Sequence, residues 1–188
     1  LPSSLGKLNC TKTRPIDVEK ISSEKLAKYL ESGKVSLEEL NVNQLLNIIN
    51  DESSNYTIND LSETQIRNLL DAKFIKLEEL TASQALEQIN SSEGKYEVSD
   101  LSDSQVRSLL DSGDIKLEEL TAYQALEQIT NPEGKYEISD LTNEQSIELI
   151  DNNKLEIDQI LEYINNSHSI NEKVIAKYFD SFIGKNLS

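Results

Sequence analysis

Apolar residues recur along this chain at helical spacing, in short runs that each follow the same polar signal. After Ser102, for example, Val106, Leu109 and Leu110 fall on one face of a helix. Six such runs begin just after a leucine, and the leucines are spaced by 21 and 19 residues in alternation: Leu40, Leu61, Leu80, Leu101, Leu120 and Leu141. The pattern predicts short amphipathic helices in units of about 20 residues.

The polar signal is Ser/Thr-x-x-Gln, the sequence of a capping box. In this motif the hydroxyl of the Ser or Thr before the helix accepts a hydrogen bond from the backbone N–H of the Gln three residues later. The side-chain oxygen of that Gln in turn accepts from the backbone N–H of the Ser or Thr. The pairs are Ser62/Gln65, Thr81/Gln84, Ser102/Gln105, Thr121/Gln124 and Thr142/Gln145, with Asn41/Gln44 as a variant. We therefore expect a helix to start at each pair, with the preceding leucine placed as a hydrophobic staple.

Glycines indicate where these helices end. Gly33 and Gly113 follow YLES and LLDS and are expected in the left-handed conformation that closes a helix, whereas Gly94 and Gly134 fall in turns. The LEEL segments between helices favour a single helical or 3₁₀ turn. For YEVSD and YEISD, extended chain and a turn stay open.

Residues 61–100 and 101–140 agree at 28 of 40 positions without a gap. The chain thereby resembles α-solenoid repeat proteins as a class, over about residues 21–165. That resemblance implies a quasi-one-dimensional architecture whose usual role is binding. We predict an all-α fold, a right-handed stack of short capped helices whose units of about 20 residues pair into 40-residue repeats.

Three segments follow from this pattern. Residues 1–16 lack periodicity and are expected to form an irregular leader, residues 17–168 hold the helical tandem repeats, and residues 169–188 form a longer C-terminal capping helix. The capping helix carries an apolar stripe that we expect to close the stack: Ile170, Val174, Tyr178, Phe179 and Phe182.

Charge and composition narrow the function. The net charge of −16, from 34 acidic and 18 basic residues, repels phosphate backbones, so nucleic acid is a poor partner. The sequence contains no run of 18 apolar residues, so we expect no membrane insertion. Cys10 and His168 are the single cysteine and histidine, and two such residues are too few for a zinc site. Cys10 lies in the leader with no partner in view, which disfavours a Cys/His nucleophilic pair. We expect no enzyme activity and no cofactor.

Calcium binding stays open as an alternative. Gly113, Ile115 and Glu119 occupy the sixth, eighth and twelfth places of an EF-hand loop, but Leu110 then falls at a ligand place in its first half. A glycine that ends one helix, followed by acidic residues that begin the next, explains the same residues.

Positions that differ between the two close copies are candidates for partner contact. They lie at predicted helix starts and loops: Ser83, Tyr123, Phe74, Asp114, Asn131 and Pro132. Drift at exposed sites explains the same variation, and both interpretations stay open. Arg67 and Arg107, with Asp71 and Asp111 four residues on, predict modest surface ion pairs.

The leading hypothesis is a non-enzymatic protein-binding repeat module or scaffold that presents a repeated acidic surface to a protein partner. Acidic repeats rich in Asn, Ile and Lys are similar to those of secreted or surface effector proteins of bacteria with AT-rich genomes. The similarity implies a secreted or cell-surface location rather than a cytoplasmic one. The alternatives are a structural spacer or self-assembling array, a divergent calcium-binding helix-loop-helix protein and, least favoured, an enzyme that uses acidic residues outside the standard motifs.

Overall fold

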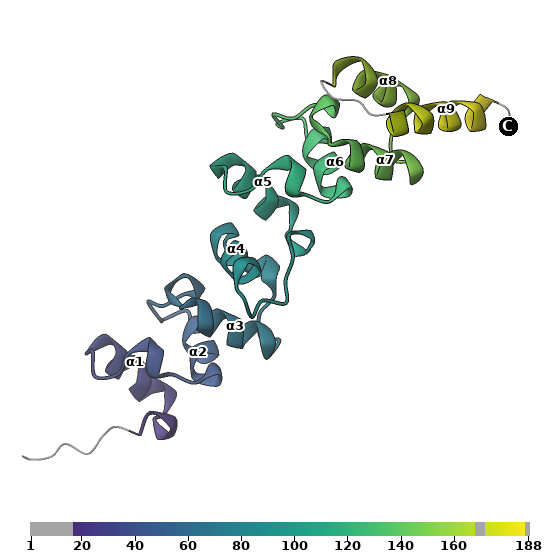
Figure 1. Cartoon of the computed structure of the whole chain (residues 1–188). Helices are drawn as coiled ribbons and strands as arrows, with labels where there is room; N and C mark the ends of the chain where they lie inside the picture. Colours follow the sequence, from purple (N-terminus) through teal and green to yellow (C-terminus); the bar gives the residue numbers. More distant parts are fainter. Residues whose placement is uncertain (1–16, 168–171, 187–188) are drawn as a thin grey trace, which may run out of the picture. The chain divides into compact units, whose positions relative to one another are not determined.

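The computed structural model describes residues 17–167 and 172–186, and within them the chain is all-α, with nine α-helices, seven 3₁₀ turns and no strand (Figure 1). The α-helices are α1 (Ser23–Glu31), α2 (Val42–Ile49), α3 (Glu63–Asp71), α4 (Ala82–Asn90), α5 (Asp103–Ser112), α6 (Ala122–Thr130), α7 (Asn143–Asp151), α8 (Ile157–Asn166) and α9 (Glu172–Asn186). The 3₁₀ turns are η1 (Val18–Lys20), η2 (Leu37–Glu39), η3 (Ile58–Asp60), η4 (Leu77–Glu79), η5 (Val98–Asp100), η6 (Leu117–Glu119) and η7 (Ile138–Asp140). The predicted all-α repeat fold is confirmed.

Contacts divide the chain into two compact units, one ending at Leu69 and the other beginning at Leu70, inside α3. In the first unit α1 packs against α2. In the second unit each of α4, α5 and α6 packs against the helix that follows it, and α9 packs against α7 and α8. Regularly spaced helices that contact their successive neighbours form a helical repeat stack.

The predicted helix starts are confirmed. At α5, Ser102 N–H donates to Gln105 Oε1 at 3.0 Å and Gln105 N–H donates to the Ser102 hydroxyl at 3.4 Å. The same reciprocal pair begins α2, α3, α4, α6 and α7. These local bonds satisfy backbone donors that a helix of eight to ten residues leaves open at its start.

Helix ends repeat every forty residues in a left-handed conformation. Gly33 (φ +67°) and Gly113 (φ +81°) adopt it as predicted. Lys73 (φ 59°) and Asn153 (φ 54°) occupy the same place in the other copies, which glycine spacing alone does not reveal. The backbone geometry of this turn is therefore set by the repeat, and a side chain there carries a conformational cost.

The segments between helices are 3₁₀ turns closed by their own acidic residues. In η6, Lys116 N–H donates to Glu119 Oε2 at 2.6 Å, and in η5, Glu97 N–H donates to Asp100 Oδ2 at 2.8 Å. The turn expected for LEEL is confirmed. For YEVSD and YEISD the extended alternative was wrong beyond the first residues, because Glu97 is extended but Val98–Asp100 is a turn.

The core is aliphatic. It contains the leucine that precedes each cap, the apolar residue five positions later in α2 to α6, and further leucines within the helices, for example Leu101, Val106 and Leu109, each under 7% exposed. Small side chains let neighbouring helices approach, and Ala85 and Ala125 are fully buried. Because an isolated helix of this length is marginal in water, this burial between neighbours is what stabilises it.

The capping glutamines also join one repeat unit of about 20 residues to an earlier repeat unit. Gln105 Nε2 donates to Leu77 O at 2.8 Å and to Leu80 O at 3.0 Å, so a helix start binds the 3₁₀ turn 28 and 25 residues before it. Gln145 makes the same pair of bonds to Leu117 O and Leu120 O, both at 2.9 Å. Gln65 donates to Leu37 O at 2.7 Å within the first unit. Each of these side chains is 9% exposed or less.

The C-terminal helix α9 differs from the expected cap. Val174 is buried and Tyr178 half-buried, as a capping role requires, but Phe179 is 54% and Phe182 42% exposed. Part of the predicted stripe therefore lies on the outer face of α9 rather than against the stack. Ile170, Cys10 and His168, together with the leader 1–16, lie outside the described residues.

Candidate functional site

The predicted contact residues lie on two different edges of the second unit. Tyr123, near the start of α6, is 41% exposed, and Lys154 Nζ, just after the end of α7, lies 5.8 Å from the centre of its ring. Lys154 and Asp114 occupy equivalent positions forty residues apart, because their backbone N–H groups donate to the equivalent carbonyls Leu149 O and Leu109 O. Tyr123 and Ser83 are also forty residues apart, so the repeat places Asp114 near Ser83 as it places Lys154 near Tyr123. Ser83, Asp114 and Tyr123 therefore share one edge.

Phe74 continues this edge by the same spacing, since it precedes Asp114 by forty residues, and its ring is 43% exposed. Asn131 and Pro132 do not belong to it. They follow the last residue of α6, at the opposite end of the helix from Tyr123. The helix α6 therefore separates Tyr123 from Asn131 and Pro132.

The predicted Arg–Asp surface pairs were wrong. Asp71 and Asp111 instead pair with lysines of the turn after the next helix, Lys95 at 2.9 Å and Lys135 at 2.8 Å. Arg67 pairs with Glu63, one helical turn before it. Tertiary packing brings a lysine 24 residues away to each aspartate, and sequence spacing within a helix could not show this.

The acidic residue suspected of binding calcium, Glu119, has a structural partner. It accepts the backbone N–H of Lys116 in its own turn at 2.6 Å, as Glu39 accepts that of Ser36 at 2.7 Å in an earlier repeat, and Gly113 has the conformation of a helix end. Across residues 17–167 and 172–186, no group of three or more His, Cys, Asp and Glu side chains is placed to hold a metal ion.

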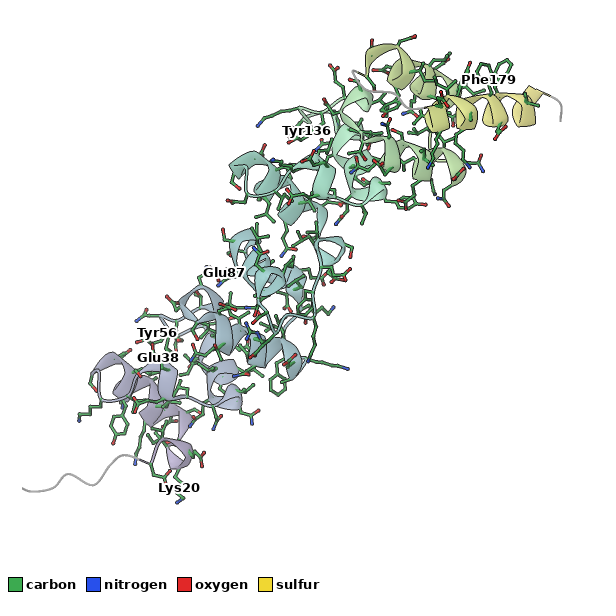
Figure 2. The ribbon with its side chains drawn as sticks, viewed as in Figure 1. Lys20, Glu38, Tyr56, Glu87, Tyr136 and Phe179 are labelled. Atoms are coloured by element: carbon green, nitrogen blue, oxygen red, sulfur yellow. The ribbon has the colours of Figure 1, made fainter. Side chains whose placement is uncertain are left out.

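Large apolar side chains gather on the outer face of α9. Ile175, Phe179, Phe182 and Ile183 follow one another at helical spacing and are 40 to 54% exposed. Figure 2 shows Phe179 projecting from this helix. The side chain of Tyr178 supports the stripe, since its ring centre lies 5.4 Å from that of Phe179 and 6.1 Å from that of Phe182. We call these four exposed residues the α9 apolar stripe.

The surface also carries hollows of modest polarity. The largest described, about 610 Å³, lies in the first unit beside Leu37, Tyr56 and Gln65. A smaller one of about 140 Å³ lies in the second unit and includes the buried side chain of Gln128.

Among the described residues, three ionisable groups have shifted pKa values, each through a hydrogen bond at the surface. Bonds from the Ser53 hydroxyl and backbone lower the pKa of Asp51. The bond to Asp111 raises the pKa of Lys135, and the bond to Asp151 raises that of Lys177. All three shifts strengthen the charged form, so none prepares a group for proton transfer near neutral pH.

No protein-family model, curated protein or solved structure matches this chain. None of the helices in the described part combines the length and the apolar character that crossing a membrane requires. The repeat fold and its surfaces are therefore the basis on which a function is proposed.

Proposed function

We propose that this chain is a non-enzymatic protein-binding repeat module, acting as a scaffold for a protein partner. The observation that carries the proposal is the α9 apolar stripe, because four large apolar side chains together on one helix face are unusual on a protein surface and typical of interaction sites. A secreted or cell-surface location, and a role as part of an effector protein, belong to the same proposal.

The distribution of charge supports binding through α9. The chain carries −16 overall, yet α9 combines acidic residues with three lysines in its fifteen positions. Lys177 is bound to Asp151 of α7 at 2.6 Å, which holds the helix against the stack while its apolar stripe stays accessible. A partner with an apolar groove would remove Phe179 and Phe182 from water, and the surrounding acidic surface would favour partners with basic rims.

A pull-down with matched variants tests the proposal. The full chain, a Phe179→Ser/Phe182→Ser variant and a Leu161→Ser control are immobilised and exposed to host-cell and cell-wall extracts, and captured proteins are quantified by mass spectrometry. Leu161 is a suitable control because its side chain is also exposed (36%) but belongs neither to the α9 apolar stripe nor to the predicted contact residues. A partner should be captured by the wild type and the control and lost from the double variant. Capture that is equal on all three chains, or on an unrelated protein of equal charge, would contradict the proposal.

The α9 apolar stripe also favours one alternative, a self-assembling array in which two copies pair through this helix. Sedimentation velocity at increasing protein concentration distinguishes the two functions. A binding module sediments as one species throughout, whereas an array shows growing species that disappear in the Phe179→Ser/Phe182→Ser variant.

A further inference from the structure

The hollow of about 610 Å³ lies within the first unit and is lined by parts of α1, η2, η3 and the first turn of α3. Figure 2 labels Glu38 and Tyr56, which both line it. Its apolar wall consists of two half-buried residues, Leu37 and Tyr56, and three buried ones, Leu30, Val35 and Leu61. Hollows of about 300 to 1,000 Å³ hold drug-sized ligands, so this one has room for the side chains of a short peptide.

The charged side chains that line this hollow are acidic. They are Glu38 and Asp60, and none of the described basic residues is part of the lining. Asp60 Oδ2 accepts the N–H of Thr57 at 2.7 Å, so its second carboxylate oxygen is open to another donor. Glu38 forms no ion pair or hydrogen bond with any residue in the described ranges. Lys34, close by in the chain, lies 5.5 Å from the ring centre of Tyr29 instead.

The two later repeats place a lysine beside the glutamate that corresponds to Glu38. These pairs are Lys76–Glu78 at 3.5 Å and Lys116–Glu118 at 4.0 Å. In residues 21–60, the first of the three forty-residue repeats, the position of that lysine is taken by Ser36, which also lines the hollow. The first repeat therefore keeps the glutamate and lacks the cation that accompanies it elsewhere.

The first repeat lacks a second cation next to the hollow. Asn55, the neighbour of Tyr56 in the chain, occupies the position of a lysine that pairs with an aspartate in each later repeat. Those pairs are Lys95–Asp71 and Lys135–Asp111. The residue that corresponds to the aspartate is Glu31, so the acidic charge is again retained. Two unneutralised acidic positions make this surface more attractive to a cation than its counterparts in the later repeats.

We propose that this hollow binds an arginine side chain of a protein partner, with Glu38 and Asp60 accepting hydrogen bonds from its guanidinium. The aliphatic part of an arginine packs on apolar surface, here Leu37, and its planar head stacks on an aromatic ring, here Tyr56. The five N–H donors of the guanidinium bind carboxylates better than the compact ammonium of lysine does. The inference rests on the proposed protein-binding function, but the hollow shares no residue with the α9 apolar stripe.

Nuclear magnetic resonance on the full ¹⁵N-labelled chain tests the proposal. The backbone N–H signals of Leu37, Glu38 and Tyr56 are followed during titration with the blocked peptide acetyl-Leu-Arg-Leu-amide, and acetyl-Leu-Gln-Leu-amide is the neutral reference. We expect a saturable shift with a Kd on the order of millimolar, since few contacts form, and binding of the neutral peptide about fivefold weaker. Equal Kd values for the two peptides, or the largest shifts outside the hollow, overturn the proposal. Shifts of the same signals with protein concentration alone would assign the hollow to a second copy of the chain and also overturn it.

Variants of exposed residues locate the binding site. Ser36→Lys supplies the cation that the later repeats carry at this position, so it should fold normally and weaken binding of the arginine peptide about fivefold. Glu38→Gln should weaken binding to a similar extent. Ser83→Lys and Glu78→Gln make the same changes of charge away from the hollow and should leave the Kd unchanged. A Kd in Ser36→Lys no weaker than in Ser83→Lys overturns the assignment of this hollow.

The same titration separates this inference from the function proposed above. Phe179→Ser/Phe182→Ser removes the α9 apolar stripe and should bind the arginine peptide with the Kd of the wild type. Loss of peptide binding in that variant would show that the peptide occupies the stripe, which contradicts the assignment to the hollow.

Discussion

The substitution Gln105→Glu separates the two roles of the capping glutamines. Glutamate serves a capping box as well as glutamine does, because the box needs only an acceptor oxygen for the Ser102 N–H. The other side-chain atom of Gln105 donates to Leu77 O and Leu80 O, and a carboxylate there would face two carbonyl oxygens at about the same distances, 2.8 and 3.0 Å. If capping were the whole role of Gln105, the variant would be as stable as the wild type. If the bonds from Gln105 to Leu77 O and Leu80 O contribute to stability, the variant is less stable.

The size of the effect follows from the contacts. Two hydrogen bonds of about 1 kcal/mol each are lost. The side chain is only 4% exposed, so a carboxylate there is poorly solvated, and we add about 1 kcal/mol for keeping it charged or protonating it at pH 7. We therefore expect the free energy of unfolding to fall by about 3 kcal/mol.

Gln159→Glu is the matched control. Gln159 Oε1 accepts from Glu156 N–H at 2.9 Å, as in the other capping boxes, but its half-buried amide donates to none of the described residues. The control should change the free energy of unfolding by less than about 0.5 kcal/mol. Urea denaturation followed by circular dichroism at pH 7 measures both variants. A loss in Gln105→Glu no larger than that of the control would refute the reasoning.

The same variant carries a pH signature with a definite sign. Burial beside two carbonyl oxygens raises the pKa of the introduced carboxyl in the folded state, so the folded chain binds the proton more tightly than the unfolded chain. The deficit relative to the wild type is therefore smallest below about pH 4.3, the ordinary pKa of Glu, and grows as the pH rises through the folded-state pKa. A deficit that is independent of pH would show that the carboxyl is solvated.

Three further predictions concern single positions. Lys73→Gly should raise the free energy of unfolding by about 1 kcal/mol, because glycine removes the cost of a left-handed residue (φ 59°) and only part of that gain is offset by the freer unfolded chain; a stability loss on urea denaturation would contradict it. Gly113→Ala should lower it by about 1 kcal/mol through the backbone alone, since a methyl group there meets no atom within 4 Å; calorimetry measures the change. Asp51 should titrate below its ordinary pKa, adding stability above about pH 3.9 that is lost as the pH falls, and Ser53→Ala should return the pKa toward normal in an NMR titration.

Local chemistry made much of this fold predictable. A capping box joins residues three apart, and a helix face repeats every three or four residues, so both are visible in a short stretch of sequence. Ser102/Gln105 and its counterparts therefore marked the helix starts, and Gly113 marked a helix end, before any packing was known. The duplication of forty residues then indicated a stack, because helices this short need neighbours.

The candidate sites depended on distant contacts instead. Asp111 lies four residues from Arg107 but binds Lys135, because the turn after α6 packs against α5. The contact residues predicted from variation between copies lie on two edges, since a helix separates Tyr123 from Asn131.

The sequence by itself determined which segments are helices, where each begins and that they repeat, because these properties arise from interactions among residues a few positions apart. Tertiary structure alone decided which atoms the Gln105 amide reaches 28 residues away, and that Phe179 faces outward while Val174, on the same predicted stripe, is buried. A stripe of apolar residues in the sequence predicts only that one face of the helix favours burial. Which of its side chains do so depends on the neighbours that α7 and α8 place against α9.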